Sequence, residues 1–410
     1  MRAGGGVRPT TRQRGVAIIG ATGSIGTQAL DVIARHGEHL RVVALAAGNR
    51  WREAAAAAVA TGAQALALAE PAAAAEARAQ LAGSGIQVLS GADGVDAVAA
   101  WADADVTLVA ATGLAGLRPV LTAVATGRDV ALANKESLVA GGALVTAAAR
   151  RSGARLLPVD GEHCGLFQCL HGRDAAGVSR LWLTASGGPF RTFGARRLRG
   201  VTPQQALCHP TWRMGPRITI DCATLINKGF EVIEASWLFG VATPAVRVVV
   251  HPQSVVHALV EFVDGSCIAQ CSHPDMRLPI AFALGYPERW AQTAVPALDL
   301  AALGRLTFEP PDLRRFPCLA LAYQAAELGG LAPARLNAAD EVAVARFLRG
   351  EIGFADIPRL LTDVVNRLGA TGGAGLEGIL EADAQARAEA RAWRPRRGGV
   401  AVARGKAVGS

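Results

Sequence analysis

The sequence predicts an α/β fold in three parts: an N-terminal Rossmann-like, doubly wound parallel sheet, a central α+β catalytic domain with a mobile loop, and a C-terminal helical domain. A short apolar strand runs into a glycine-rich turn and a helix over 16–36. Apolar runs then alternate with alanine-rich helical stretches as far as residue 159. Apolar residues recur at helical spacing in 318–328 and 338–348. With 410 residues, 51% of them hydrophobic, the chain can form two or three buried cores.

The glycine-rich turn reads Gly20-Ala-Thr-Gly-Ser-Ile-Gly26 and lies between a strand over 16–20 and a helix over 27–36. Glycines at such a turn let backbone amides approach a pyrophosphate, and the positive end of the helix stabilises the anion. Because the spacing differs from the commoner G-x-G-x-x-G, a turn without a ligand remains an alternative. The pattern indicates a dinucleotide-binding domain.

The second strand, over 41–47, indicates which dinucleotide binds. An NAD site usually has an acidic residue at the end of this strand, where it contacts the ribose hydroxyls. This chain has Gly48-Asn49-Arg50 at that point. Because Arg50 could face a 2′-phosphate, the sequence favours NADPH over NADH, and a merely solvated Arg50 is the alternative.

The alternation of elements also sets the expected domain bounds. We expect an NADPH-binding domain over 15–160, a catalytic domain over 161–285 with a lid over 186–216, a linker over 286–312 and a helical domain over 313–395. The ends, 1–14 and 396–410, are expected to be disordered. Further strands of the parallel sheet are expected at 65–69, 86–89, 105–112, 129–133 and 155–159, and those of a second sheet at 246–252 and 255–272 with a hairpin turn at Asp264-Gly265.

The net charge of +8 comes from the ends of the chain. Ten basic residues and no acidic residue lie in 1–14 and 391–406, so the remainder has 32 basic and 34 acidic residues. The charge therefore indicates two basic tails and no nucleic-acid-binding face. Seven cysteines without a C-x-x-C pair indicate a reduced, cytoplasmic protein. We expect no membrane partner, because no uninterrupted apolar run reaches 18 residues and no signal peptide is recognisable.

Two carboxylates, Asp160 and Glu162, follow the apolar strand over 155–159. In an extended chain, residues two apart point to the same side. Asp160 and Glu162 can then bind one hard cation, and their oxygens suit Mg²⁺ or Mn²⁺ better than zinc. Paired acids at a strand end are often only solvated, so a metal site requires a third ligand.

The third ligand is expected within 218–231, where we expect a strand to turn into a helix. Helical spacing places Asn227, Lys228 and Glu231 on one face, so that Glu231 could complete the metal shell while its neighbours hold a phosphate. Only three of the 42 basic residues are lysines, and Lys135 and Lys228 both lie in Asn-Lys motifs. A compact ammonium suits a phosphate or a developing oxyanion. The alternative is an ordinary amphipathic helix face.

Glycine pairs and prolines over 186–216 indicate the mobile lid. Trp212 and Met214 lie in its polar part. Closing such a lid would exclude water from a reactive intermediate. The alternative is that both side chains fill a gap in the core.

Eight motifs, in the correct order, closely resemble those of the 1-deoxy-D-xylulose 5-phosphate reductoisomerase family. The motifs lie at 20–26, 133–137, 158–163, 186–190, 209–215, 227–231, 251–254 and 336–339, and the likeness as a whole spans about residues 15–395. The resemblance implies an NADP-dependent oxidoreductase that converts 1-deoxy-D-xylulose 5-phosphate into 2-C-methyl-D-erythritol 4-phosphate in the non-mevalonate isoprenoid route. It also implies the use of NADPH and Mg²⁺, Mn²⁺ or Co²⁺, and a homodimer.

The resemblance also implies roles for individual residues. The metal ligands would be Asp160, Glu162 and Glu231, as the spacing already suggests. The implied NADPH contacts are Thr22, Gly23, Ser24, Ile25, Gly48, Asn49, Arg50, Asn134, Glu136 and Gly215. The implied substrate contacts are Lys135, Gly161, Glu162, Ser186, His209, Trp212, Met214, Cys222, Asn227, Lys228 and Glu231, of which Lys135 and His209 join the metal ligands in the catalytic set. The metal would polarise the ketone and the neighbouring hydroxyl, and hydride from NADPH would reduce the resulting aldehyde.

Three positions depart from the family pattern. Gly161 and Cys222 stand where serine is normal, and Asp340 stands where asparagine is usual. Gly161 lacks a hydroxyl beside the metal, and Cys222 is a weak donor for the phosphate, at a cost on the order of 1 to 3 kcal/mol for one lost hydrogen bond.

These departures leave alternatives to the standard reaction. One is a specialised paralogue that acts on a modified sugar phosphate or tolerates phosphonate inhibitors. Another is a catalytically silent NADPH-binding regulator, against which the three retained carboxylates argue. A dehydrogenase of the semialdehyde type would need a nucleophilic cysteine, and no sequence feature indicates a lowered thiol pKa at Cys164 or Cys222.

Overall fold

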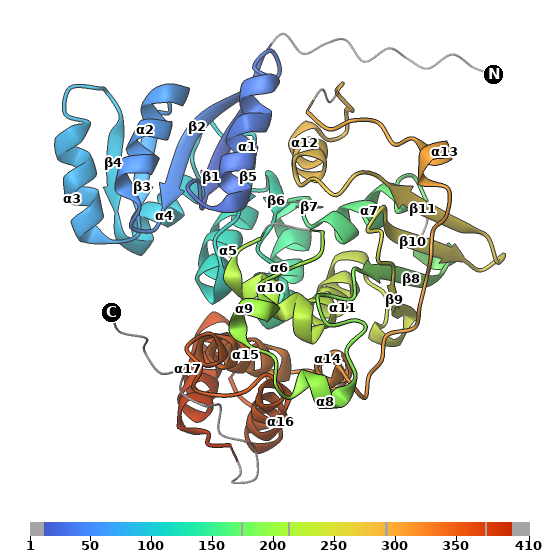
Figure 1. Ribbon diagram of the computed structural model, residues 1–410. Coiled ribbons are helices and arrows are strands. Elements are labelled where there is room, and N and C mark those ends of the chain that lie inside the picture. Colours follow the sequence, from blue (N-terminus) through green and yellow to red (C-terminus); the bar gives the residue numbers. More distant parts are fainter. Residues whose placement is uncertain (1–11, 174, 212–213, 292–293, 374, 396–410) are drawn as a thin grey trace, which may run out of the picture. The chain divides into compact units, whose positions relative to one another are not determined.

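The structure is a computed structural model that describes residues 12–395 except 174, 212–213, 292–293 and 374 (Figure 1). The described chain forms two compact units. The first unit comprises 12–134, 148–160 and 275–295, and the second comprises 135–147, 161–274 and 296–395. Both units are therefore discontinuous in sequence. The domain bounds expected above stay a prediction.

The first unit contains a seven-stranded parallel sheet in the order β4-β3-β2-β1-β5-β6-β7. The chain fills one side of β1 first and then crosses back to place β5 on the other side. This reversal makes the carboxyl ends of β1 and β5 a topological switch point, which is where such sheets bind ligands. The predicted doubly wound sheet is confirmed, with strands β1 Arg14–Ile19, β2 Leu40–Ala47, β3 Ala65–Leu68, β4 Gln87–Ser90, β5 Val106–Val109, β6 Asp129–Leu132 and β7 Leu156–Pro158.

Helices cover this sheet because its central strands are apolar on both faces. The glycine-rich turn joins β1 to α1, as predicted. The helices of the unit are α1 Ser24–Arg35, α2 Trp51–Thr61, α3 Pro71–Gln80, α4 Gly91–Ala99, the 3₁₀ turn η1 Gly113–Gly116, α5 Leu117–Ala125 and α12 Arg277–Gly285, while α6 Lys135–Ser152 passes from the second unit into the first.

Two basic residues that we had assigned to disordered tails lie in regular elements. Arg14 is the first residue of β1, where it pairs in register with Leu40, and its guanidinium hydrogen-bonds the carboxylate of Asp129. Arg391 lies in the last helix, α17 Gly375–Ala392. Assigning them to the tails was wrong because local composition carries no information about such tertiary partners. Residues 1–11 and 396–410 lie outside the described residues.

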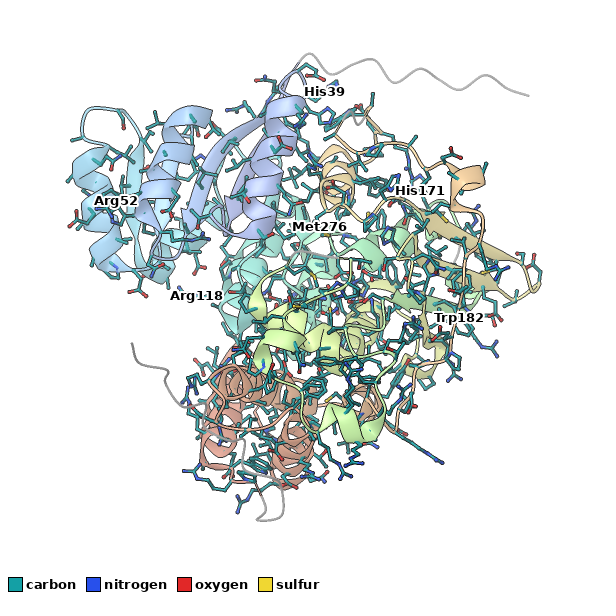
Figure 2. The ribbon with its side chains drawn as sticks, in the orientation of Figure 1. His39, Arg52, Arg118, His171, Trp182 and Met276 are labelled. Carbon is teal, nitrogen blue, oxygen red and sulfur yellow. The ribbon has the colours of Figure 1, made fainter. Side chains whose placement is uncertain are left out.

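The second unit contains a four-stranded sheet in the order β11-β10-β8-β9, with β8 Val178–Ala185, β9 Val246–Val250, β10 Val256–Phe262 and β11 Cys267–Cys271. The β10–β11 hairpin turns at Asp264-Gly265, as predicted, and Gly265 has the positive φ of 84° that favours glycine. On β8, the indole N–H of Trp182 donates to Glu261 of β10 at 3.0 Å (Figure 2). This cross-strand contact ties the two central strands together.

Helices make up the rest of the second unit, and α15 Ala332–Leu348 lies among α10, α14, α16 and α17. Large buried side chains such as Phe190, Phe230 and Phe347 belong to its core. No helix among the described residues has the length and apolar character needed to cross a membrane. The other helices of the unit are α7 Gly161–Leu170, η2 Ala175–Gly177, α8 Ala195–Leu198, α9 Pro203–Ala206, α10 Pro216–Thr224, α11 Ile226–Phe239, η3 Thr243–Ala245, α13 Leu300–Leu303, α14 Pro317–Leu328, α16 Asp356–Leu368 and α17.

The strand expected at the start of 218–231 is absent, because residues 216–224 form helix α10. Gly215 is the extended N-cap and Pro216 occupies the first turn, where its fixed φ and missing N–H are tolerated. Leu225 then joins α10 to α11 in the left-handed conformation, with φ of 62°. The prediction of a helix that carries Asn227, Lys228 and Glu231 is confirmed.

Candidate active site

Three carboxylates converge where α7 begins and where α11 passes it. Asp160 directly precedes Gly161, Glu162 lies in the first turn of α7, and Glu231 lies on α11. One oxygen from each of these acids lies within 4.8 Å of the other two. The predicted convergence is confirmed, but the extended-chain geometry proposed for it was wrong, because the chain becomes helical at Gly161.

The donor set fits a hard divalent cation. All three donors are carboxylate oxygens, which suit Mg²⁺ or Mn²⁺. Two oxygens bound to one Mg²⁺ at about 2.1 Å can be at most about 4.2 Å apart. The observed limit of 4.8 Å therefore requires side-chain adjustments below about 1 Å.

Two ammonium groups balance the charge of these acids. Nζ of Lys228 lies 2.7 Å from Oε1 of Glu162 and 2.5 Å from Oε2 of Glu231. Nζ of Lys135, in the first turn of α6, lies 2.7 Å from Oδ1 of Asn227 and 3.4 Å from Oε1 of Glu231. The Asn227 amide donates to the same Oε1 at 2.6 Å. Glu231 is 1% exposed, and each of its oxygens has a cationic partner, as a buried charge requires.

His163 fixes α7 against α11 behind the carboxylates. The ring is fully buried, with Nε2 2.9 Å from the backbone oxygen of Glu231 and Nδ1 3.2 Å from the carboxylate of Glu234. The two helices that carry Glu162 and Glu231 are thus held by one side chain. We did not predict this role, although His163 directly follows the acidic motif.

A second polar group joins the loop after β8, which carries Ser186, to the segment after α9, which carries His209. Nε2 of His209 lies 3.0 Å from Oγ of Ser186, and the backbone amide of Thr211 donates to its Nδ1 at 3.2 Å. Because Nδ1 accepts, Nε2 carries the proton and faces Ser186. Burial lowers the pKa of His209 to about 4, so the imidazole is neutral near pH 7 and acts as a hydrogen-bond donor without charge.

The same loop lies against α10 at Cys222. Gly188 has φ of 68°, and a Cβ there would lie 2.8 Å from the backbone oxygen of Cys222, so this close approach requires glycine. Burial raises the pKa of the Cys222 thiol to about 12. A protonated thiol is a poor nucleophile, which argues against the semialdehyde-type chemistry considered above.

The glycine-rich loop of the first unit has the geometry that a dinucleotide site needs. A Cβ on Gly20 would lie 2.6 Å from the backbone oxygen of Ala110, and one on Gly26 would lie 2.3 Å from that of Gly20. Gly23 caps α1, so Ser24 and Ile25 lie in its first turn. Arg50 donates to the backbone oxygen of Thr22. Arg50 therefore lies beside this loop, next to Gly48 and Asn49.

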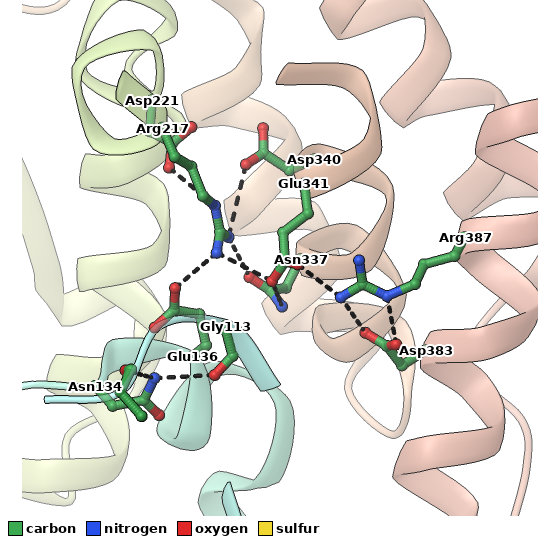
Figure 3. Close-up of polar contacts among 11 residues, drawn as sticks. Gly113, Asn134, Glu136, Arg217, Asp221, Asn337, Asp340, Glu341, Asp383 and Arg387 are labelled. Atoms are coloured by element: carbon green, nitrogen blue, oxygen red, sulfur yellow. Dashed lines mark hydrogen bonds and ion pairs between the residues drawn. The ribbon is translucent and has the colours of Figure 1, made fainter. Parts of the chain in front are cut away.

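The remaining predicted residues lie in several places. The Asn134 amide donates to the backbone oxygens of Ala111 and Gly113 at 2.8 and 3.0 Å (Figure 3). The carboxylate of Glu136 lies 2.7 Å from Nη1 of Arg217. Gly215 is the exposed N-cap of α10, Met214 is half-buried, and Trp212 lies outside the described residues.

Comparisons with known proteins identify relatives over most of this chain. Family models described as 1-deoxy-D-xylulose 5-phosphate reductoisomerase, its C-terminal domain, and the DXP reductoisomerase C-terminal domain match residues 16–142, 156–239 and 271–389. The 1-deoxy-D-xylulose 5-phosphate reductoisomerases of Methylobacillus flagellatus and Pseudomonas syringae pv. tomato are 49% and 50% identical to this chain. Each comparison covers 92% of this chain and 97% of the relative.

Solved structures of similar proteins lead to the same family. The enzyme from Zymomonas mobilis in complex with NADPH superimposes with a TM-score of 0.88 at 42% identity, over 93% of this chain and 99% of that one. A DOX-P reductoisomerase in complex with NADPH, fosmidomycin and magnesium gives a TM-score of 0.86 at 39% identity, over 92% and 98%. Matches of this identity and coverage show that the chain belongs to the 1-deoxy-D-xylulose 5-phosphate reductoisomerase family.

Proposed function

We propose that this chain catalyses the NADPH- and divalent-metal-dependent conversion of 1-deoxy-D-xylulose 5-phosphate into 2-C-methyl-D-erythritol 4-phosphate. The observation that carries the proposal is the convergence of Asp160, Glu162 and Glu231 beside the ammonium of Lys228. Relatives that share about half of its residues bear the name of this activity. A catalytically silent regulator would have no need for a preserved carboxylate group of this kind.

The three carboxylates would hold the metal, which when bound supplies Lewis-acid polarisation of the substrate's ketone and hydroxyl oxygens. Glu231 is held from two sides by Lys135 and Lys228, so it is oriented before substrate arrives. The ammonium of Lys135 lies next to the carboxylates, where it would donate a hydrogen bond to oxygens that gain negative charge during the reaction. In this arrangement Asn227 keeps Lys135 in place through its amide oxygen.

The loop after β8 would bind the phosphate group of the substrate. Ser186 Oγ and the Nε2–H of neutral His209 lie together, and Gly188 brings this loop to Cys222 on α10. Neutral donors can bind a phosphate dianion with its charge balanced by Lys228. Binding energy gained at this end would help to close the lid over the reacting end.

NADPH would bind at the glycine-rich loop of the first unit, on residues Thr22 to Ile25, with Arg50 recognising the 2′-phosphate. Arg50 is exposed and lies beside Thr22, which supports this assignment. Contacts of the cofactor with Gly48, Asn49, Asn134, Glu136 and Gly215 follow from the family resemblance. We further propose that the protein is cytoplasmic and forms a homodimer. Size-exclusion chromatography with light scattering would test the homodimer by its molar mass.

The activity test is oxidation of NADPH by the purified protein with Mg²⁺ and 1-deoxy-D-xylulose 5-phosphate, with the product identified by mass spectrometry. We expect turnover that disappears with a chelator and returns with Mg²⁺ or Mn²⁺. Glu231→Gln should abolish this turnover, whereas Glu389→Gln, which changes a carboxylate paired with Arg367 on the surface, should keep it. Absence of turnover in folded, metal-loaded protein would refute the proposal.

The paralogue alternative has its own test. A Cβ on Gly161 would meet nothing closer than Nδ1 of His257, at 3.8 Å, so serine fits there. Gly161→Ser and Cys222→Ser should each leave the reaction intact. One restored hydrogen bond is expected to strengthen inhibition by fosmidomycin about 10-fold or more. If either change does so, the residue at that position in the wild type is the cause of inhibitor tolerance.

A further inference from the structure

Arg217, in the first turn of α10, is the centre of an ionic network in the second unit (Figure 3). Its Nη1 donates to Glu136 at 2.7 Å and to Glu341 at 3.0 Å, and its Nη2 donates to Asn337 at 2.9 Å. Two further carboxylates lie somewhat farther away: Asp221 is 3.6 Å from Nε, and Asp340 is 4.0 Å from Nη2. One guanidinium thus joins three helices, α6, α10 and α15.

The contact with Glu136 gives Arg217 a connection to the candidate active site. Glu136 directly follows Lys135 in the first turn of α6, and Lys135 contacts Asn227 and Glu231. Helix α6 is interrupted at Gly141, whose φ of −128° and ψ of 23° are not helical. The segment before this interruption is too short to be a stable helix alone, so its position depends on tertiary contacts such as Glu136–Arg217.

We propose that Arg217 is a positioning residue for the reaction: through Glu136 it holds the first turn of α6 against α15, and so places the ammonium of Lys135. This inference rests on the proposed function. Within the part of the chain that the structure describes, the polar contacts of Arg217 do not include the carboxylates that would bind the metal. It acts through the adjacent helix turn, which is how a residue outside the chemistry can still change the rate.

Two buried carboxyl groups, Asp221 and Asp340, lie next to Arg217. Their protonation decides how strongly they compete with Glu136 for its guanidinium. Both are at most 5% exposed and lie within hydrogen-bonding reach of each other. Oδ1 of Asp221 and both oxygens of Asp340 accept no hydrogen bond from any other described residue. Four carboxylates around one guanidinium would be strongly unbalanced unless one acid kept a proton. Burial, and then the neighbouring Asp221, holds the pKa of Asp340 well above its usual range, and burial raises the pKa of Asp221 to about 6.

A proton retained by this pair has a geometric consequence. A pair that keeps one proton carries one negative charge less, so it attracts the guanidinium of Arg217 less strongly. Nη1 of Arg217 then binds Glu136 and Glu341. The other charged or titratable groups near the pair are Lys135 on α6, whose ammonium lowers the pKa of Asp221, and Cys318 on α14, whose thiol is kept protonated by burial. Arg387 on α17 binds the second oxygen of Glu341 and completes the network.

The network offers a matched control. Arg387 also donates to two carboxylates, Glu341 and Asp383, in the same helical bundle, and among the described residues these hydrogen bonds do not reach the first turn of α6. Arg217→Met and Arg387→Met therefore both remove a guanidinium from the network. Only the first change removes a partner of Glu136.

The chain has only three lysines, so ¹⁵N-lysine labelling gives at most three ammonium signals, from Lys135, Lys228 and Lys406. We expect Arg217→Met to shift or broaden the Lys135 signal and to lower kcat about 10- to 100-fold, the range that a misplacement near 1 Å can cause. KM for NADPH should stay within about twofold. Arg217→Lys, which keeps a cation near Glu136 and adds a fourth ammonium signal to the three of the wild type, should restore part of kcat and should fold if Arg217→Met does not. Arg387→Met should change neither the Lys135 signal nor kcat.

An unchanged Lys135 signal in Arg217→Met and in Arg217→Lys would overturn the inference, as would equal losses of kcat in Arg217→Met and Arg387→Met. Wild-type protein without turnover would count against the proposed function and not against this inference. In that case the ammonium signals alone decide whether Arg217 places Lys135.

Discussion

Replacing Asp340 by asparagine tests whether the buried carboxyl pair holds a proton. Asparagine has nearly the same shape and is always neutral, so Asp340→Asn removes the ionisation without leaving a cavity. It can also donate a hydrogen bond to Asp221, as a protonated Asp340 would. We expect the variant to fold and to differ from the wild type mainly in how its stability changes with pH.

The magnitude follows from the pKa of the pair. Burial raises the pKa of Asp221 from 3.8 to about 6, and burial, followed by the neighbouring carboxyl, also holds the pKa of Asp340 well above its usual range. An acid with a raised pKa stabilises the folded state fully below its unfolded pKa, and this contribution is lost as the pH rises through the folded pKa. For one proton and a shift of about 2 units, the wild type loses about 3 kcal/mol between about pH 4 and about pH 6 or above.

The variant does not bind this proton, so the loss should be absent or much smaller. The free energy of unfolding of Asp340→Asn, minus that of the wild type, should therefore rise with pH by up to about 1.4 kcal/mol per unit. Urea unfolding followed by circular dichroism, at a series of pH values from about 5 to 8 and constant ionic strength, measures this difference. The reciprocal change Asp221→Asn should give a rise of the same sign, and the double variant should add little to either single one, since one proton is shared. A difference that is flat, or that falls as the pH rises, would refute the shared proton.

Three other results are expected. Gly229→Ala should destabilise the protein by about 1 to 3 kcal/mol, visible as a lower thermal midpoint, because its Cβ would lie 2.3 Å from that of Ala322; an unchanged midpoint would show that α11 and α14 can separate freely. His209, whose pKa is lowered to about 4, should give imidazole NMR signals that titrate near that pH and should contribute stability that is lost as the pH falls from about 6.5 to 4; titration near 6.5 would contradict its burial. Mg²⁺ binding measured by calorimetry should weaken at least about 10-fold in Glu162→Gln, and an unchanged affinity would exclude Glu162 as a ligand.

Much of the fold was predictable because its signals are local. The strand, glycine turn and helix at the N-terminus follow one another within 14–35, and the later strands show as short apolar runs. The expectation of a strand at the start of 218–231 was wrong for a related reason: a short apolar run alone does not distinguish a strand from a buried helix turn. Pro216 after an extended Gly215 is a helix-start signal, and it would have corrected the assignment.

The candidate site was predictable where its residues lie in one motif, and unpredictable where they meet through packing. Asn227, Lys228 and Glu231 share a helix, so spacing alone grouped them. His163 and Arg217 were missed because their partners lie far away in sequence, at Glu234 and at Glu136 and Glu341. Nothing in the pattern of one sequence records such pairs. The prediction that Asp160 and Glu162 lie together was correct, but the reason given for it was wrong. We expected an extended strand, whereas the start of helix α7 brings the two side chains together.

The geometry also explains why lysines are found at these two positions in a chain whose other basic residues, apart from Lys406, are arginines. Nζ of Lys228 donates from a single atom to two carboxylates, at 2.7 and 2.5 Å, in a site where the residue is only 4% exposed. A guanidinium spreads its donors over a rigid planar fork and is larger, so it could not occupy the same point between Glu162 and Glu231 without moving a helix. Lys135 reaches the opposite oxygen of Glu231 in the same manner. The two ammonium groups hold the buried carboxylate of Glu231 from both sides. Because each ammonium is small, the carboxylate oxygens can still turn toward a cation. The need for a small cation on each side therefore accounts for both lysines.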